Sequence, residues 1–217
     1  MFDEDQTFNK RVVSMVYELI EQFNPAFVDK NLKRGEVIYH EGSPPDALYF
    51  VEDGLVGLFH VTESGKESFL RVFTKGDILG HRSYFAHEEY HASAIALTKT
   101  RLRMITKEKV DGFLQENPKL LYKLLELLAK DLGKAELRMA SLVDKSANAR
   151  IAESLVCLKL KYPNQTWTRK EIAEYSGSTL ESVTRLMSQL AEEGLIVKQG
   201  RDFSFEDHNK ILEKFEL

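Results

Sequence analysis

The sequence predicts an α+β protein in which an N-terminal antiparallel β-roll, one long helix and a small helical domain with a β-hairpin follow one another. Three observations predict this order. Short apolar runs alternate with glycine-containing turns from residue 27 to residue 105, which favours antiparallel strands. Residues 118–143 repeat leucine at steps of three and four, which favours a long helix. Residues 168–195 read as two short helices joined by a tight turn.

The first part of the chain is expected to begin with an amphipathic helix over residues 7–22, which the Asn24-Pro25 pair ends. Strands are then expected at the apolar runs EVIYH, ALYFV, LVGLFHV, SFLRVF, HASAIAL and RLRMI. Glycine recurs about every ten residues between them, which suits a roll whose strands reverse at each end.

The long helix begins at Pro118, a favourable first helical residue, and would extend about 39 Å. One small domain cannot cover a helix of this length, so we expect it to pack on a second copy of itself as a short coiled coil. A long helix packed only within one chain is the alternative. The expected dimer seam consists of Leu121, Leu124, Leu125, Leu128, Leu132 and Ala135.

The helix pair at residues 168–195 has the signals of a helix-turn-helix motif. Gly177 stands where the first helix must end, and Thr179 can cap the second helix, which is expected from about Thr179 to Glu192. The second helix would enter the DNA major groove, where Arg185 can pair with guanine and Glu181 with cytosine. An ordinary αα-hairpin in a helical core is the alternative. The apolar faces comprise Ile172, Ala173, Val183, Leu186, Met187 and Leu190.

The segment after this motif reads as a tight hairpin over residues 195–205, which would make the domain a winged helix. A polar break at Asp144 separates it from the long helix. The predicted domains are therefore a sensor roll over 1–116, a dimerisation helix over 117–144 and a DNA-binding domain over 145–217.

Composition restricts the function classes. The 217 residues carry a net charge of −4, and residues 145–217 hold 11 basic and 11 acidic side chains, so basic residues must gather on one face if this part binds DNA. Cys157 alone cannot hold an iron–sulfur cluster and is expected to be a buried structural thiol. No apolar run suits a bilayer and the first residues lack a secretory pattern, so a cytoplasmic protein without membrane contacts is expected. No catalytic motif is present, so we expect a protein that is not an enzyme.

The order of these parts resembles the CRP/FNR family of bacterial transcription regulators. The resemblance is carried by GEVIYHEGSPPDALYFVEDGLVGLF, GKESFLRVFTKGDILG and TRKEIAEYSGSTLESVTRLMSQLAEEGLI. It implies a cyclic-nucleotide-binding-like jelly roll whose pocket takes an effector. It also implies a homodimer that binds palindromic promoter DNA and acts on RNA polymerase.

The resemblance implies that Glu181, Thr184 and Arg185 read bases. Leu180 stands where the CRP branch has arginine, and Glu-x-x-Thr-Arg is closer to the Glu-x-x-Ser-Arg of the FNR branch, which implies half-sites similar to TTGAT. The positions that match phosphate contacts are Thr168, Arg169, Thr179, Ser182, Gln199 and Gly200.

The effector region departs from the cyclic-nucleotide pattern. His81 replaces the glutamate that binds the ribose, and His91, followed by Ala92, replaces the arginine that binds the cyclic phosphate. Imidazole is a poor substitute for a guanidinium on phosphate, so the effector is expected not to be cyclic AMP and is otherwise unknown. A cyclic-nucleotide-binding regulatory protein is the alternative function, and a haem or metal held by His81 and His91 is the alternative cofactor. No metal site is assigned. The implied pocket positions are Gly80, His81, Arg82, Ser83, His91 and Ala92.

Overall fold

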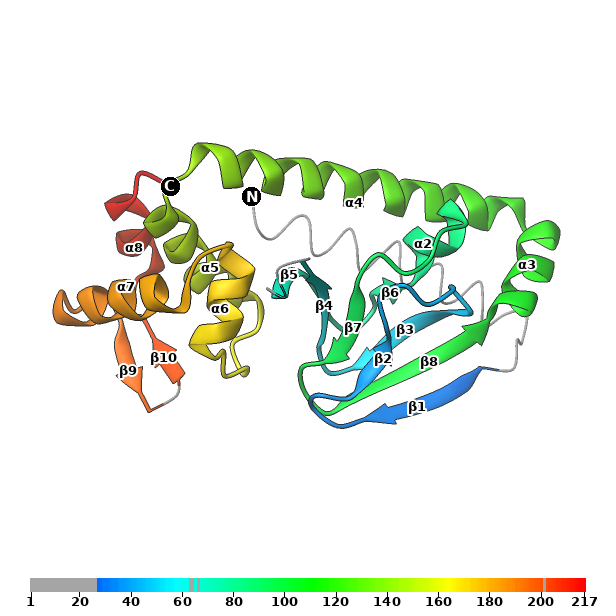
Figure 1. Cartoon of the computed structure of the whole chain (residues 1–217), viewed down its shortest axis with the longest axis horizontal. Coiled ribbons are helices and arrows are strands. Elements are labelled where there is room, and N and C mark those ends of the chain that lie inside the picture. The colour runs from blue at the N-terminus through cyan, green and yellow to red at the C-terminus, as the bar shows by residue number, and fades with distance from the viewer. Residues whose placement is uncertain (1–26, 63–64, 66, 201) are drawn as a thin grey trace. The chain divides into compact units, whose positions relative to one another are not determined.

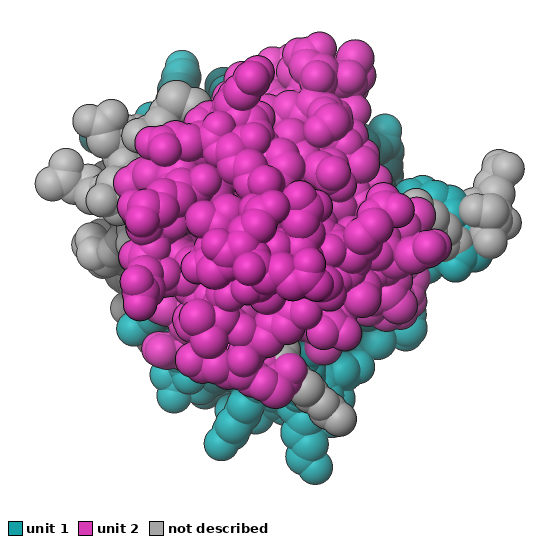
Figure 2. Space-filling model, turned by 90° about the vertical axis from the view of Figure 1, so that its left-hand side faces the viewer, with its two compact units in different colours: residues 1–65, 70–135 teal, residues 66–69, 136–217 magenta. Residues whose placement is uncertain are grey.

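The computed structural model describes residues 27–62, 65, 67–200 and 202–217, and Figure 1 shows their helices and strands. The helix expected over residues 7–22 lies outside these described residues. The chain divides into two compact units, one formed by residues up to 65 and 70–135 and one by residues 66–69 and 136–217 (Figure 2). The predicted fold class is confirmed, because strands come first, a long helix follows and a winged helix-turn-helix comes last.

The first unit contains a roll of two four-stranded antiparallel sheets, in the orders β1-β8-β3-β6 and β2-β7-β4-β5. Two strands, β1 and β6, fall outside the predicted apolar runs, because one is largely polar and the other has two residues. The strands are β1 (Val28–Leu32), β2 (Val37–Tyr39), β3 (Ala47–Asp53), β4 (Val56–Val61), β5 (Glu67–Phe73), β6 (Ile78–Leu79), β7 (Ser93–Ala96) and β8 (Thr100–Thr106).

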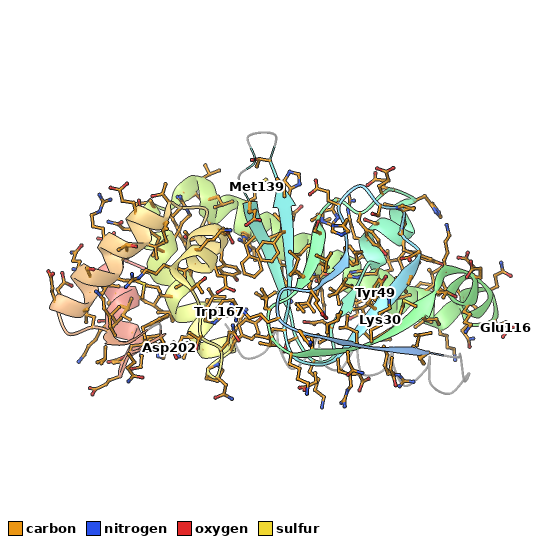
Figure 3. The ribbon with its side chains drawn as sticks, turned by 60° about the horizontal axis from the view of Figure 1, so that its bottom comes forward. Lys30, Tyr49, Glu116, Met139, Trp167 and Asp202 are labelled. Atoms are coloured by element: carbon orange, nitrogen blue, oxygen red, sulfur yellow. The ribbon has the colours of Figure 1, made fainter. Side chains whose placement is uncertain are left out.

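Apolar side chains fill the space between the two sheets. Strand β3 lies between β8 and β6, and its residues from Ala47 to Val51 are buried, as a continuous apolar run predicts for a central strand. Tyr39 stacks on Tyr90 with ring centroids 3.8 Å apart, and Tyr49 lies in the same cluster (Figure 3). Aromatic packing therefore makes up part of the roll's interior.

Two short helices in the first unit were not predicted. Helix α2 (His81–Ala86) follows Gly80, whose φ is +84°. A Cβ added at Gly80 would lie 2.9 Å from the carbonyl oxygen of Ala47. Helix α3 (Lys107–Glu116) directly precedes the long helix. The Tyr84 hydroxyl of α2 donates a hydrogen bond to the Asp111 carboxylate of α3, so the two helices are tied to each other.

The long helix α4 (Pro118–Asp144) contains 27 residues and has the predicted extent. Its buried face, Leu120, Leu124 and Leu127, packs into the cluster of Leu48 and Phe50 from the roll. The assignment of Leu124 to the dimer seam is therefore wrong, because this side chain is only 2 % exposed within one chain. Large apolar side chains that stay exposed along α4 include Leu121, Leu125, Leu132, Met139 and Leu142.

The second unit packs its helices around an apolar core and adds a β-hairpin. Trp167 is 1 % exposed and lies against Phe69 and Tyr162, with ring centroids 6.4 and 5.7 Å apart (Figure 3). The hairpin pairs Gln199 with Asp202 next to the turn. The elements are α5 (Ala147–Lys161), α6 (Arg169–Ser176), α7 (Leu180–Glu192), β9 (Val197–Gln199), β10 (Asp202–Ser204) and α8 (His208–Lys214).

Candidate nucleic-acid interface and effector region

Both ends of α6 have identifiable capping residues. Gly177 was predicted to end the helix, whereas the capping box at its start was not predicted. Gly177 ends α6 in the left-handed region, with φ +61°. Thr168 forms a capping box at the start of α6: its Oγ1 accepts from the Glu171 amide at 3.2 Å, and its own amide donates to Glu171 Oε2 at 2.8 Å. Such caps each stabilise a helix by about 1 kcal/mol. The T-x-x-E spacing is readable in the sequence.

Helix α7 separates a buried apolar face from an exposed polar one. The predicted apolar residues Val183, Leu186, Met187 and Leu190 are all buried. Thr179 caps the helix, since its Oγ1 accepts from the Ser182 amide at 3.1 Å. Because the apolar face is occupied by the core, the opposite face of α7 remains for contacts outside this unit.

That exposed face of α7 carries the predicted base-reading positions. Glu181 and Arg185 are exposed and stand one helical turn apart, and Thr184 is half-buried between them. The Thr184 hydroxyl donates to the Leu180 carbonyl at 2.8 Å. Gln189, further along the helix, donates instead to Glu193 at 3.1 Å.

The predicted phosphate-contacting positions lie at the start of α6, at the start of α7 and at the end of β9. Thr168, Arg169 and Thr179 are exposed and Ser182 is half-buried. Gln199 and Gly200 are exposed at the tip of the hairpin. These contacts stay a prediction, and Arg201 lies outside the described residues.

Lys170 opens α6 but is already engaged with two carboxylates. Its Nζ lies 2.7 Å from Glu67 and 3.4 Å from Glu174 in the same unit. The hydrogen bond from Lys170 holds the pKa of Glu67 below its usual value, while burial raises the pKa of Glu174. Lys170 is therefore a weaker candidate for a phosphate contact than Arg169 beside it.

Two lysines join the hairpin to neighbouring helices, one from a helix and one from the hairpin itself. Lys159 of α5 donates to both carboxylate oxygens of Asp202, at 3.0 and 2.9 Å, and lies over the Phe203 ring at 5.7 Å. Lys198 of β9 donates to the Ser188 hydroxyl of α7 at 3.0 Å. The hairpin and the candidate recognition helix are thus fixed relative to each other within this unit.

Arg150 is a positioning residue that the sequence did not indicate. Its guanidinium donates to the carbonyls of Ser176 at 3.1 Å, Gly177 at 3.3 Å and Lys145 at 2.8 Å. It therefore joins the helix-turn-helix turn to the segment between α4 and α5. An arginine within a helix of mixed composition resembles a surface residue, so no local signal could have identified it.

The implied effector positions have different environments. Gly80 is half-buried, and Ser83 and Ala92 are buried, with the Ser83 hydroxyl donating to the Glu89 carbonyl at 3.1 Å. Arg82 is exposed and pairs with Glu88 at 2.9 Å, so it does not supply an inward-facing cation. His91 is exposed, and partial desolvation together with the positive charge of Arg82 lowers its pKa.

His81 is the implied effector residue with the most distinctive surroundings. It is 4 % exposed, and its Nε2 lies 3.3 Å from Asp131 Oδ2 of α4. Arg71 Nη1 lies 2.5 Å from the same oxygen. Burial alone would raise the pKa of Asp131, but the hydrogen bond from His81 and the charge of Arg71 lower this pKa to about 2.

The described residues hold no group of three or more His, Cys, Asp or Glu side chains arranged to bind a metal ion. Cys157 is a buried free thiol, as expected, and its Sγ lies 4.0 Å from the Tyr175 hydroxyl. Across the part of the chain that the structure describes, no helix combines the length and apolar composition needed to cross a bilayer.

Comparison with known proteins assigns a family to both units. Residues 29–117 match the family model of the cyclic nucleotide-binding domain, and residues 149–213 match that of the Crp-like helix-turn-helix domain. The chain is 31 % identical to a cyclic AMP receptor protein of Thermus thermophilus, over 75 % of this chain and 76 % of that protein. It is 24 % identical to a CRP-like cAMP-activated global transcriptional regulator of Mycobacterium tuberculosis, over 91 % of each.

Solved structures give the same result. A CRP/FNR-family transcriptional regulator from Thermus thermophilus is 30 % identical and superposes with a TM-score of 0.73, covering 88 % of this chain and 99 % of that one. The c-di-GMP responsive global regulator CLP of Xanthomonas campestris shares the fold, with a TM-score of 0.78 at 21 % identity, covering 88 % of this chain and 99 % of that one. From these matches and the two units described above, we conclude that the chain belongs to the CRP/FNR family of transcription regulators.

Proposed function

We propose that this chain is a homodimeric regulator that binds palindromic DNA through α7 and acts in the cytoplasm by binding rather than by catalysis. The observation that carries the proposal is the polar face of α7, where exposed Glu181 and Arg185 stand opposite a fully buried apolar face. A helix presented in this way can lie in the major groove with its first turns against base edges.

The proposed readout assigns Arg185 to guanine, Glu181 to the cytosine amino group and Thr184 to a neighbouring base. Thymine-rich half-sites similar to TTGAT follow from the likeness of Glu-x-x-Thr-Arg to the FNR branch. Phosphate contacts from Arg169 and from the helix starts would fix the register, with the hairpin residues Gln199 and Gly200 beside the helix. The bound dimer would then present a surface to RNA polymerase.

The proposed dimer forms along the exposed stripe of α4. Leu121, Leu125 and Leu132 are 49, 60 and 60 % exposed, and the steps between the stripe residues alternate between four and three. This spacing is the heptad pattern of a two-stranded coiled coil. The stripe comprises Leu121, Leu125, the half-buried Leu128, Leu132, Ala135, Met139 and Leu142.

Gel-shift titration of the purified protein tests this function. The probe is a duplex with two inverted TTGAT half-sites whose centres lie one helical turn apart or a multiple of it, and the control duplex has the same composition in scrambled order. We expect a complex with the palindrome that tolerates competitor DNA and weakens as salt rises. Equal affinity for the two duplexes, or no complex at low salt, would contradict the proposal.

Cyclic AMP is expected to leave the thermal unfolding of this protein unchanged. His81 and His91 stand where a glutamate and an arginine would bind ribose and phosphate, and His81 is already paired with Asp131. A ligand at 100 times its Kd stabilises a protein by about 2.7 kcal/mol, which differential scanning fluorimetry detects.

The palindromic duplex serves as the positive control in the same assay. A saturable rise of several degrees with cyclic AMP would instead favour the alternative, a regulator whose roll holds a cyclic nucleotide.

A further inference from the structure

The first unit contains a buried charged cluster that the proposed DNA readout does not use. Arg71 comes from β5, His81 from the first position of α2 and Asp131 from the middle of α4. One carboxylate oxygen, Asp131 Oδ2, receives both contacts, at 2.5 Å from Arg71 Nη1 and 3.3 Å from His81 Nε2. Three elements separated in sequence thus meet at one oxygen atom.

The geometry of this cluster is that of an anion held by cationic and hydrogen-bonding side chains. Arg71 also packs its guanidinium over the Phe73 ring, 4.6 Å from the centroid. The Asp131 side chain is 13 % exposed and that of His81 is 6 % exposed, so water screens their contact little. A buried carboxylate is stable in such a place only when its charge is compensated.

The cluster is not saturated with hydrogen bonds. Asp131 Oδ1 and His81 Nδ1 are buried and have no hydrogen-bond partner among the residues that the structure describes. Burying such atoms without a hydrogen bond is costly, and a carboxylate can accept hydrogen bonds at both oxygens. Asp131 therefore contacts Arg71 and His81 through one oxygen, as the end of a bound anion would.

The cluster lies in the region where the family resemblance implies that an effector binds. His81 follows Gly80 in the domain that matches cyclic nucleotide-binding proteins, at a position implied to contact an effector. Arg82 and His91, the other cationic candidates of that region, are exposed. Arg71 of β5 is only 29 % exposed, and the Asp131 carboxylate of α4 already pairs with it.

We propose that Arg71 and His81 form an anion site of the roll and that the Asp131 carboxylate fills this site from α4 as an internal ligand. The site would accept a small carboxylate or another oxyanion once Asp131 is removed. In the intact protein, the contact that an anionic effector would make with Arg71 and His81 is made by the chain itself. The proposal concerns the protein without DNA and does not depend on the DNA readout.

Chemical rescue of Asp131→Ala tests the proposal directly. Alanine preserves helix propensity but leaves the anion position empty, so we expect the midpoint of thermal unfolding to fall by about 5–10 °C. Titration with sodium acetate, with ionic strength held constant by sodium chloride, should restore at least half of this loss in a saturable manner. The wild type should not respond to acetate.

Glu126→Ala is the matched control, because it removes a carboxylate from the same helix that pairs only with surface partners, Lys123 and Lys130, among its described ion pairs. It should neither lower the midpoint strongly nor respond to acetate. The double variant Arg71→Ala/Asp131→Ala should lose the acetate response. An acetate response that persists without Arg71, or that is absent from Asp131→Ala, would overturn the proposal.

A second measurement applies where Asp131→Ala does not fold. Asp131→Asn keeps the side-chain volume and removes the charge, so it can be combined with Arg71→Met in a double-mutant cycle. We expect Arg71→Met to lower the unfolding midpoint strongly in the wild type and little in the Asp131→Asn background. Additive shifts would show that the two side chains are not coupled and would also overturn the proposal. Both readouts use free protein, so failure of DNA binding would bear on the proposed function alone.

Discussion

Replacement of Arg185 by alanine is expected to abolish sequence-specific DNA binding while the fold and the dimer stay intact. The side chain is exposed on α7, so its removal opens no cavity in the core. A bidentate arginine–guanine contact contributes about 1–3 kcal/mol of discrimination, and a dimer on a palindrome loses this contact in both half-sites. The measurement is the ratio of affinities for the palindromic and scrambled duplexes.

Lys210→Ala is the matched control for Arg185→Ala. It removes the same charge from an exposed position in α8 of the same unit, outside the helix-turn-helix. It should weaken binding to both duplexes slightly and leave their ratio unchanged. If Arg185→Ala keeps the ratio of the wild type, α7 does not read bases through this residue.

Replacement of Leu132 by glutamate is expected to convert the protein to monomers and to weaken DNA binding further than Arg185→Ala. Leu132 is 60 % exposed in one chain, so the substitution costs the isolated chain little. In a dimer, two glutamates would meet without water in the middle of the apolar stripe. Loss of the second half-site removes an avidity gain of about 10²–10⁴. Sedimentation equilibrium reports the mass and gel shift reports the affinity.

Leu137→Glu provides the comparison on the same helix. Leu137 is 69 % exposed but lies on the side of α4 away from the heptad stripe, five residues beyond Leu132. This variant should sediment as the wild type does. A dimeric Leu132→Glu protein would show that the α4 stripe is not the dimer interface.

The helix-turn-helix could be predicted from the sequence because local rules decide it. Gly177 at the end of α6, the Thr179 cap and the spacing of Val183, Leu186 and Leu190 act over a few residues, and each has the structural role that it indicates. The strands of the roll could be predicted for the same reason, since apolar runs between glycine turns leave few alternative secondary structures. Strand β1 was missed because its residues VDKNL lack such a run.

The two faces of α4 could not be separated from periodicity alone. Leucines at steps of three and four serve both the roll and the exposed stripe, so Leu124 and Leu125 are neighbours in sequence but differ in burial, at 2 and 60 % exposed. The division depends on where the roll lies against the helix, which is tertiary information. A single stripe read from the sequence therefore mixed members of both faces.

The charged cluster around Asp131 could not be predicted from the sequence either. His81 and Asp131 are 50 positions apart, and each charged residue alone resembles a solvated side chain. Only the packing of α2 and α4 against β5 brings them together. Arg150 was missed for the same reason, because its three carbonyl acceptors come from the segment between α4 and α5 and from the end of α6.

The lysine contacts of the hairpin have a consequence for the speed and thermodynamics of association. Lys159 and Lys198 hold β9 and β10 against α5 and α7 before any partner arrives. The conformational entropy of the hairpin is therefore lost during folding and not during binding. A binding surface prepared in this way requires little rearrangement on encounter, so its association rate should be limited by diffusion and orientation rather than by ordering of the hairpin.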